Sequence, residues 1–196
     1  MRELSLHILD IVENGIKAGA DFLDIRVQES STDDRLIFSV EDNGSGMPAE
    51  KARNIDDPFI TGRKTRRVGL GLSLLASAAG RCDGGITVEG WAGKGTRVRA
   101  SFRRSHIDRA PLGDMAATLA VLIAGYPHID FRYTHGVNEK EFVLDTRDLK
   151  SELEGLSLSD PVVVHHVTES IRRSLEGLAE THPEPPMEGP DGQADL

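Results

Sequence analysis

The feature that most constrains this chain is the stretch VEDNGSGMP, Val40 to Pro48. The apolar run 36–40 ends here in acidic residues, and two glycines follow, Gly44 and Gly46. This pattern predicts a strand that stops at an acidic residue and turns sharply. Glycine permits positive φ and lets a flat ligand approach the backbone. The Asp42 carboxylate can accept a hydrogen bond from an amino group such as that of adenine, although the motif alone is also typical of a simple turn.

Length, charge and cysteine content limit the class of protein. The 196 residues suffice for one domain, or one domain with an appendage. The net charge of −9 argues against general binding to nucleic acid or anionic membranes. No apolar run reaches the roughly 20 residues that span a bilayer, and the first residues do not resemble a secretory signal. The single cysteine, Cys82, suits a reducing compartment, so we expect a cytoplasmic protein.

A local basic cluster stands out within the acidic total. It comprises Arg63, Lys64, Arg66 and Arg67, directly before a glycine pair. Such a run is typical of a solvated loop, and its position before glycines equally favours an anionic partner.

Hydrophobic periodicity predicts alternating helices and strands in the first half of the chain. We expect helices at 3–19, 49–56 and 69–79, strands at 22–29, 35–41, 86–91 and 96–102, and a mobile loop at 57–68. The strands at 22–29 and 35–41 are separated by a short turn and should pair as a hairpin. The order predicts an α+β, two-layer α/β sandwich with helices over one face of a sheet.

Two of these helices carry unusual residues. Asp10, Asn14 and Lys17 recur at four and three residues, so they project from neighbouring turns of one side. They form either a polar stripe facing water or part of a site. Gly15, in mid-helix, costs about 1 kcal/mol relative to alanine, which argues for a reason to retain it.

The helix at 69–79 begins on two glycines, in GLGLSLL. The N-terminus of a helix offers unpaired N–H groups and a partial positive charge, and glycine lets phosphate oxygens reach them. This pattern favours phosphate binding.

Together these motifs resemble the Bergerat-fold ATP-binding domain shared by gyrase, Hsp90, histidine kinases and MutL proteins. DIVENGIKAGAD, VEDNGSGMP, DPFITGRKTRRVGLGLSLL and GKGTRVRASF resemble its four boxes, in order, between Leu4 and Phe102. The resemblance implies a Bergerat ATP-binding domain at 1–104 that binds ATP and Mg²⁺.

The resemblance also implies which residues form the site. The residues expected to bind nucleotide are Asn14, Lys17, Asp42, Gly44, Gly46, Met47, Arg63, Lys64, Gly69, Leu70, Gly71, Leu72 and Thr96. Asp42 would read adenine, and Asn14 would ligate Mg²⁺ through its amide oxygen. Asp10 occupies the position where hydrolytic members carry a general-base Glu and many histidine kinases carry Asn. Because Asp is one methylene shorter than Glu, the choice between hydrolysis and phosphotransfer stays open.

The remainder of the chain matches no motif. Residues 105–180 should form an α/β extension, with helices at 114–124, 148–153 and 161–179 and a hairpin of strands 129–133 and 141–145. Residues 181–196 form an acidic tail, rich in Pro and Gly, that should be disordered. We expect the extension to dock a partner or to form a homodimer.

Three histidines invite interpretation as phosphoacceptors or ligands. His7 lies on the apolar face of its helix, which favours a core residue over a phosphorylation site. His165 and His166 are adjacent on a helix and point about 100° apart, which is poor geometry for joint metal ligation. We interpret all three as structural.

These observations predict an ATP-binding regulator in signal transduction. The first hypothesis is a protein kinase of the histidine-kinase or anti-sigma type that acts on a separate regulatory protein. The alternative is an ATP-gated switch or slow ATPase without phosphotransfer to protein. Asn14, an intact candidate magnesium ligand, argues against a third possibility, a module in which nucleotide is purely structural.

Overall fold

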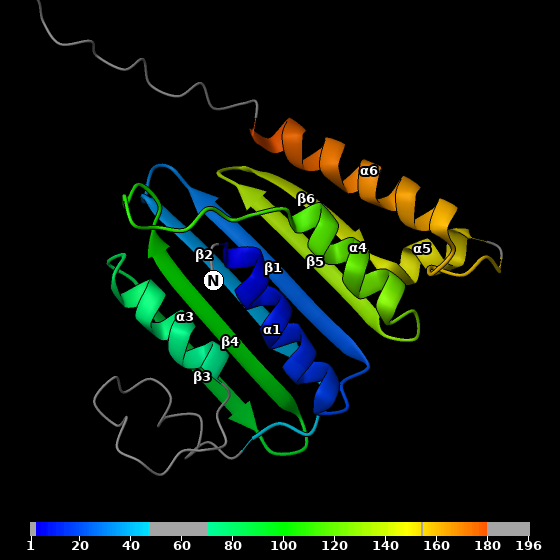
Figure 1. The fold of residues 1–196 in the computed structure, drawn as a ribbon, viewed down its shortest axis with the longest axis horizontal. Helices are drawn as coiled ribbons and strands as arrows, with labels where there is room; N and C mark the ends of the chain where they lie inside the picture. Colours follow the sequence, from blue (N-terminus) through cyan, green and yellow to red (C-terminus); the bar gives the residue numbers. More distant parts are fainter. Residues whose placement is uncertain (1–2, 48–69, 154, 180–196) are drawn as a thin grey trace, which may run out of the picture.

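Six strands form one mixed sheet in the order β3-β4-β2-β1-β5-β6, and the helices lie on one side of it (Figure 1). This computed structural model describes residues 3–47, 70–153 and 155–179. The strands are β1 (Phe22–Ser30), β2 (Arg35–Asp42), β3 (Gly85–Trp91), β4 (Gly95–Arg103), β5 (Asp130–Val137) and β6 (Lys140–Asp145). The helices are α1 (Leu4–Lys17), α3 (Leu70–Gly80), α4 (Met115–Gly125), α5 (Thr146–Glu152) and α6 (Pro161–Ala179). The helix expected at 49–56, the loop at 57–68 and the tail at 181–196 lie outside the described residues.

The β1–β2 hairpin is the centre of the molecule. Its strands pair antiparallel from Leu23 opposite Asp42 to Ser30 opposite Arg35, which confirms the predicted hairpin. Alternate residues such as Ile25 and Phe38 are buried beneath the helices, as a period of two requires. The opposite face of the sheet carries polar and charged residues. This arrangement confirms the predicted two-layer sandwich with helices on one face.

Helix α1 lies across the sheet because one of its faces is apolar. Leu4, Ile8 and Val12 recur at four-residue intervals and are fully buried. The helix ends at Lys17, and Gly19 then adopts φ 82° while its N–H bonds to the carbonyl of Ile16. Only glycine takes this left-handed conformation without strain, so it explains why the helix stops here.

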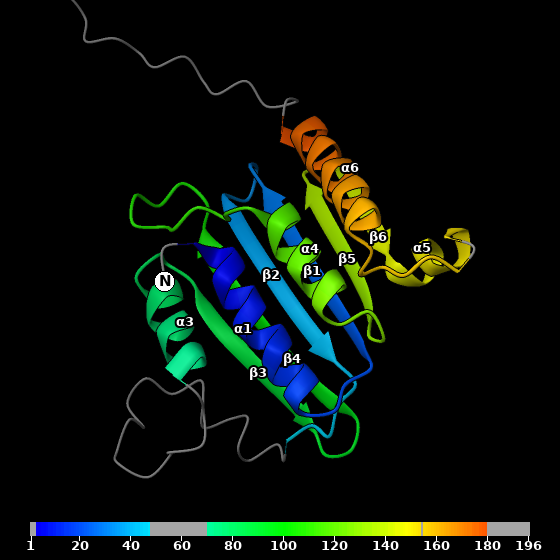
Figure 2. The same ribbon diagram turned by 45° about the vertical axis from the view of Figure 1, so that its right-hand side comes forward.

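The extension continues the same sheet. β5 pairs parallel to β1, and β6 pairs antiparallel to β5. Helix α4, capped by Asp114 through a 2.8 Å hydrogen bond to the Ala117 N–H, packs beside α1, and α6 packs on α4 and β6 (Figure 2). The division at 104/105 stays a prediction, but the strands of both parts belong to one sheet.

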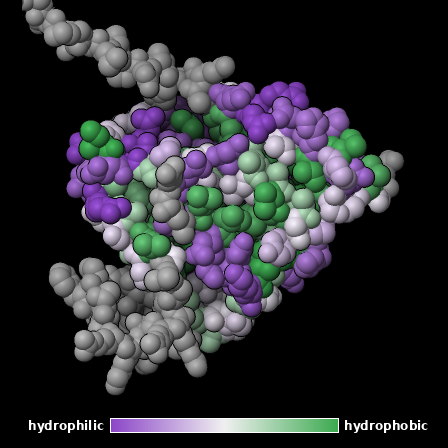
Figure 3. All heavy atoms as spheres, in the orientation of Figure 1, coloured by the Kyte–Doolittle hydropathy of each residue, from purple (hydrophilic) through white to green (hydrophobic). Residues whose placement is uncertain are grey.

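The outer surface of the helix layer is partly apolar. Figure 3 shows hydrophobic residues gathered over its middle, and Leu6 of α1 and Val121 of α4 are 43% and 62% exposed. Within the described ranges, no helix has the length and apolar content needed to cross a bilayer.

Candidate nucleotide site

Asp42 lies where β2 ends, directly against helix α1. A Cβ placed on Gly15 would lie 2.9 Å from the Asp42 Cβ and 3.0 Å from a methyl carbon of Leu23. Real Cβ atoms essentially never come so close, so glycine lets the helix approach the end of the strand. This contact supplies the reason for a glycine in the middle of α1.

The loop after Asp42 is fixed at its first residue by the Asn43 side chain. Its carboxamide oxygen accepts hydrogen bonds from the backbone N–H groups of Asp21 and Phe22, at 3.0 and 3.1 Å. Its amide nitrogen donates to the Asp21 carboxylate at 2.6 Å. Asn43 thus joins the end of β2 to the start of β1.

The two motif glycines stand where larger residues would collide. A Cβ on Gly44 would lie 2.9 Å from the Ala18 carbonyl oxygen. Gly46 has φ 64°, and a Cβ there would collide with the carbonyl oxygen of Trp91. The Gly93 N–H also donates to the Ser45 carbonyl at 2.8 Å, so the β3–β4 turn is interlocked with this loop. The motif loop is therefore held on both sides by backbone contacts.

The Asp42 carboxylate has a raised pKa. Burial raises it, and the backbone N–H groups of Gly44 and Thr96 partly oppose this shift. The Gly44 N–H donates to Asp42 Oδ1 at 2.9 Å. Within the described residues no cation pairs with this carboxylate, so it retains the capacity to accept a hydrogen bond from a ligand.

Met47 and Thr96 are both neighbours of Gly90 in β3, at the Asp42 end of the sheet. Met47 packs against the hydrophobic core, and a Cβ on Gly90 would collide with its side chain. Thr96 lies opposite Asp42 in the β2–β4 register. The structure therefore brings together Asp42, Gly44, Gly46, Met47 and Thr96.

A second group forms where α1 faces the start of α3. A Cβ on Gly71 would collide with the Asp10 carboxylate, which places Asp10 against the first turn of α3. Leu72 packs on the core. Leu70 is the first residue of α3. The predicted catalytic carboxylate and the predicted phosphate-binding glycine are thus neighbours.

Asn14 and Lys17 project from α1 into solvent. Among described residues, the Asn14 carboxamide makes no hydrogen bond, which leaves its oxygen available as a ligand. Lys17 forms an exposed pair with Glu13 at 3.1 Å, so in this structure it contacts α1 itself. Arg63, Lys64 and Gly69 lie outside the described residues.

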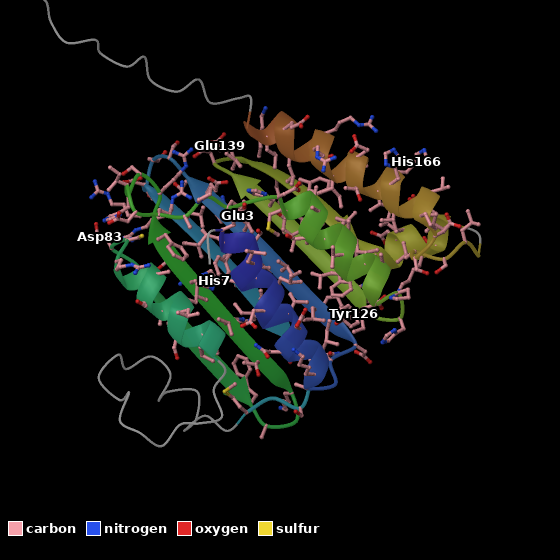
Figure 4. All side chains as sticks on the ribbon, viewed as in Figure 1. Glu3, His7, Asp83, Tyr126, Glu139 and His166 are labelled. Carbon is pink, nitrogen blue, oxygen red and sulfur yellow. The ribbon has the colours of Figure 1, made fainter. Side chains whose placement is uncertain are left out.

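The positions of the three histidines are those expected of structural residues. His7 is 4% exposed, lies on the side of α1 that faces α3 (Figure 4), and burial lowers its pKa. His165 and His166 are exposed, and His166 Nδ1 lies 2.8 Å from the Val162 carbonyl oxygen. Within the described residues, no group of three His, Cys, Asp or Glu side chains could hold a metal ion.

The sequence did not predict the contacts that three residues make in this site: Gly15, Asn43 and Trp91. The cost of a mid-helix glycine marked Gly15, but its contact partner was not predictable from spacing. Asn43 looked like an ordinary turn residue, and Trp91 like the end of a strand. Their roles depend on contacts between segments distant in sequence.

Comparison with known proteins identifies the class. The family model described as "Histidine kinase-, DNA gyrase B-, and HSP90-like ATPase" matches residues 2–106, more than half of the chain. The chain therefore belongs to this family.

The curated proteins similar to this chain include bacterial kinases. Sporulation kinase C of Bacillus subtilis (strain 168) is 33% identical over 94 residues, which cover 48% of this chain and 22% of that protein. Sensor histidine kinase YxdK of the same strain is 30% identical over 104 residues, covering 50% of this chain and 32% of the relative. The chain thus spans only about a fifth to a third of these relatives.

A solved structure described as the N-terminal domain of a DNA repair protein has a TM-score of 0.50 at 18% identity. It covers 74% of this chain and 53% of its own. This likeness shows the fold alone. Its coverage exceeds that of the family match, so it includes part of the extension.

Proposed function

We propose that this chain binds ATP at the Asp42 end of the sheet and that Asp42 accepts a hydrogen bond from the adenine amino group. The observation that carries the proposal is the half-buried Asp42 carboxylate, whose described partners are backbone N–H groups only. A carboxylate with a raised pKa in such a place is typical of a functional site. Family membership supports the nucleotide as its ligand.

The residues around Asp42 suit a flat base. Gly44 and Gly46 present backbone without side chains, Met47 offers an apolar contact, and Thr96 adds a hydroxyl beside Asp42. These residues would hold and orient the adenine and limit its contact with water. Because the cradle is built from backbone positions that a Cβ would fill, its shape is largely preformed.

The phosphates would extend toward the start of α3. Gly71 stands in the first turn, where helix N–H groups are unpaired and where an anion is stabilised. Asn14 would ligate Mg²⁺ together with phosphate oxygens, because the ion prefers hard oxygen ligands and usually keeps waters. When bound, Mg²⁺ would neutralise phosphate charge during transfer.

We further propose that the chain is a kinase-like regulator that acts on a separate protein. Alignment with kinases over half of the chain supports this reaction class. An ATP-gated switch or slow ATPase is the second candidate, favoured by the position of Asp10. Its carboxylate lies against Gly71, at the end of the site where the γ-phosphate would be placed.

The test is incubation of the purified chain with γ-labelled ATP and Mg²⁺, following label in protein and in free phosphate. Label on an added partner protein supports the kinase, and free phosphate alone supports the ATPase. Asp10→Asn should abolish phosphate release if Asp10 is the base. Asp42→Asn is the matched control for both reactions, because it should strongly weaken nucleotide binding itself. If wild type and Asp42→Asn bind ATP equally well by calorimetry, the proposed site is wrong.

A further inference from the structure

The face of the sheet that carries no helix contains a region without acidic side chains. It consists of three successive outward positions on each of the neighbouring strands β4, β2 and β1. These nine residues are Arg99, Ser39 and Arg26 in one row, Ser101, Ile37 and Gln28 in the next, and Arg103, Arg35 and Ser30 in the third. We call this region the arginine platform. Four arginines in nine positions contrast with the net charge of −9 for the whole chain.

The middle row of the platform carries no charged side chain. It continues to Gly85 on β3, which lies opposite Ser101 and over which a Cβ would meet nothing within 4 Å. The arginine rows on its two sides are four residues apart along a strand, about 13 Å. That separation leaves room for one extended peptide crossing the strands, with arginines on both sides.

The arginines retain capacity for a further anion. Arg26 pairs with Asp24 at 2.6 Å, and Arg103 pairs with Asp34 at 3.0 Å and with Asp83 at 3.5 Å, yet the two arginine side chains are 61% and 52% exposed. Arg99 forms no hydrogen bond or ion pair through its guanidinium within the described residues. A guanidinium has five donors, so an exposed arginine that already has a carboxylate partner can still bind a further one. The platform therefore suits an acidic ligand.

An acidic segment of the chain itself begins within reach. Residues 180–196 contain Glu180, Glu184, Glu188, Asp191 and Asp195 and no Lys or Arg. They follow α6, whose end lies at the same end of the sheet as the turn between β1 and β2 (Figures 1 and 2). Seventeen residues span up to about 56 Å. Passing β6, β5 and β1 takes about 15 Å, and the layer thickness adds about 10 Å.

We propose that the acidic segment 180–196 of this chain docks across the arginine platform and covers the open sheet face in cis. Its carboxylates pair with Arg99, Arg26 and Arg103, and its backbone lies along the uncharged middle row. The proposal does not depend on nucleotide binding.

Disulfide trapping in the full-length chain tests this contact. The native Cys82 is buried, so it should not compete with the introduced cysteines. Ser39→Cys on the platform is combined with Gly192→Cys, and the control pair joins Gly192→Cys to Ser77→Cys on the exposed side of α3. Each pair is made with the native segment and with a neutral one carrying Glu184→Gln, Glu188→Gln, Asp191→Asn and Asp195→Asn.

The rate of intramolecular disulfide formation is measured under mild oxidation of dilute protein. Neutralising the segment should slow this reaction about 10-fold for the Ser39→Cys and Gly192→Cys pair, because the undocked segment brings its cysteine to the platform less often. Salt should slow it similarly. The Ser77 pair should not respond. Arg99→Gln should slow the Ser39 pair, whereas Arg173→Gln, on the exposed side of α6, should not.

Equal closure with native and neutral segments would overturn the proposal, as would crosslinks only between chains, which would indicate a second copy. Thermal unfolding checks that each variant folds. If the Ser39→Cys variant does not fold, Ser101→Cys takes its place on the platform.

Discussion

The β1–β2 hairpin carries a carboxylate near each of its two ends, on the face of the sheet that the helices cover. The surroundings of these two carboxylates shift their pKa values in opposite directions. Asp42 has backbone N–H partners only, and burial raises its pKa. Glu29 faces His135 at 3.3 Å and Arg104 at 3.5 Å, and the hydrogen bond from His135 is the main cause that lowers its pKa. His135 in turn lies 2.9 Å from the Tyr133 hydroxyl, and burial raises the pKa of Tyr133.

The opposite pKa shifts have opposite consequences for the stability of the fold. A carboxylate with a lowered pKa stabilises the fold at neutral pH, because the folded state favours its ionised form. A carboxylate with a raised pKa does the opposite, so ionised Asp42 opposes folding. A protein retains such a group where a ligand supplies the missing partner. The comparison supports the proposal that Asp42 serves binding, whereas the lowered pKa of Glu29 is typical of a group that stabilises the fold.

Replacing Asp42 should give the largest effect. Asp42→Asn should weaken ATP affinity by about 100-fold, because it removes a charged hydrogen-bond acceptor from a partly desolvated site. Its thermal stability should equal or exceed that of wild type, since an unfavourable buried charge disappears. Titration calorimetry and thermal unfolding measure the two properties. A loss of stability together with unchanged affinity would reverse the roles assigned to the two ends.

Gly46→Ala should lower both stability and affinity. The added Cβ collides with the Trp91 carbonyl at a left-handed φ of 64°, at a cost of about 1–3 kcal/mol. Denaturant unfolding and calorimetry are the measurements. Gly80→Ala is the matched control, because a Cβ there meets nothing within 4 Å and alanine favours the helix. If Gly46→Ala proved as harmless as its control, the interlocked loop would not be tight.

Glu29→Gln should destabilise the fold by about 1–2 kcal/mol at neutral pH, because it removes the negative charge from the hydrogen bond with His135 and from the ion pair with Arg104. ATP affinity should not change. The wild-type contribution should be present above the ordinary carboxyl pKa and should fade as the pH falls through the lowered pKa of Glu29. Urea unfolding across acidic pH, compared between the two proteins, would contradict this if their difference did not shrink.

The smallest effect concerns pH and the nucleotide. Because the pKa of Asp42 is raised, mild acid should protonate it before ordinary aspartates and should weaken ATP binding. The affinity of wild type should therefore fall with pH more than ATP protonation alone explains, by a few-fold. An ATP-binding protein without a carboxylate at the adenine position provides the reference curve.

The sequence predicted most of the first half of the fold because its signals are local. Alternation gave the strands of the β1–β2 hairpin, and glycine-rich loops marked the ends that meet at Asp42. The pairing of β5 with β1 could not be predicted in this way, since no local pattern says which strand edge receives the 130–145 hairpin. The same holds for Glu29 and His135, which are 106 residues apart and meet only because β1 and β5 are neighbours. Of the predicted site, Arg63, Lys64 and Gly69 lie outside the described residues, and the assigned roles stay predictions.

The parallel pairing of β1 with β5 has a consequence for synthesis of the chain. β1 ends at Ser30, and its parallel partner is complete only at Val137. At typical elongation rates of about 5–20 residues per second, β1 leaves the ribosome with that edge unpaired for about 5–20 seconds. An open strand edge is a template for pairing with other chains. Nascent chains should therefore need protection by a chaperone until the extension emerges, and products that stop near residue 104 should aggregate.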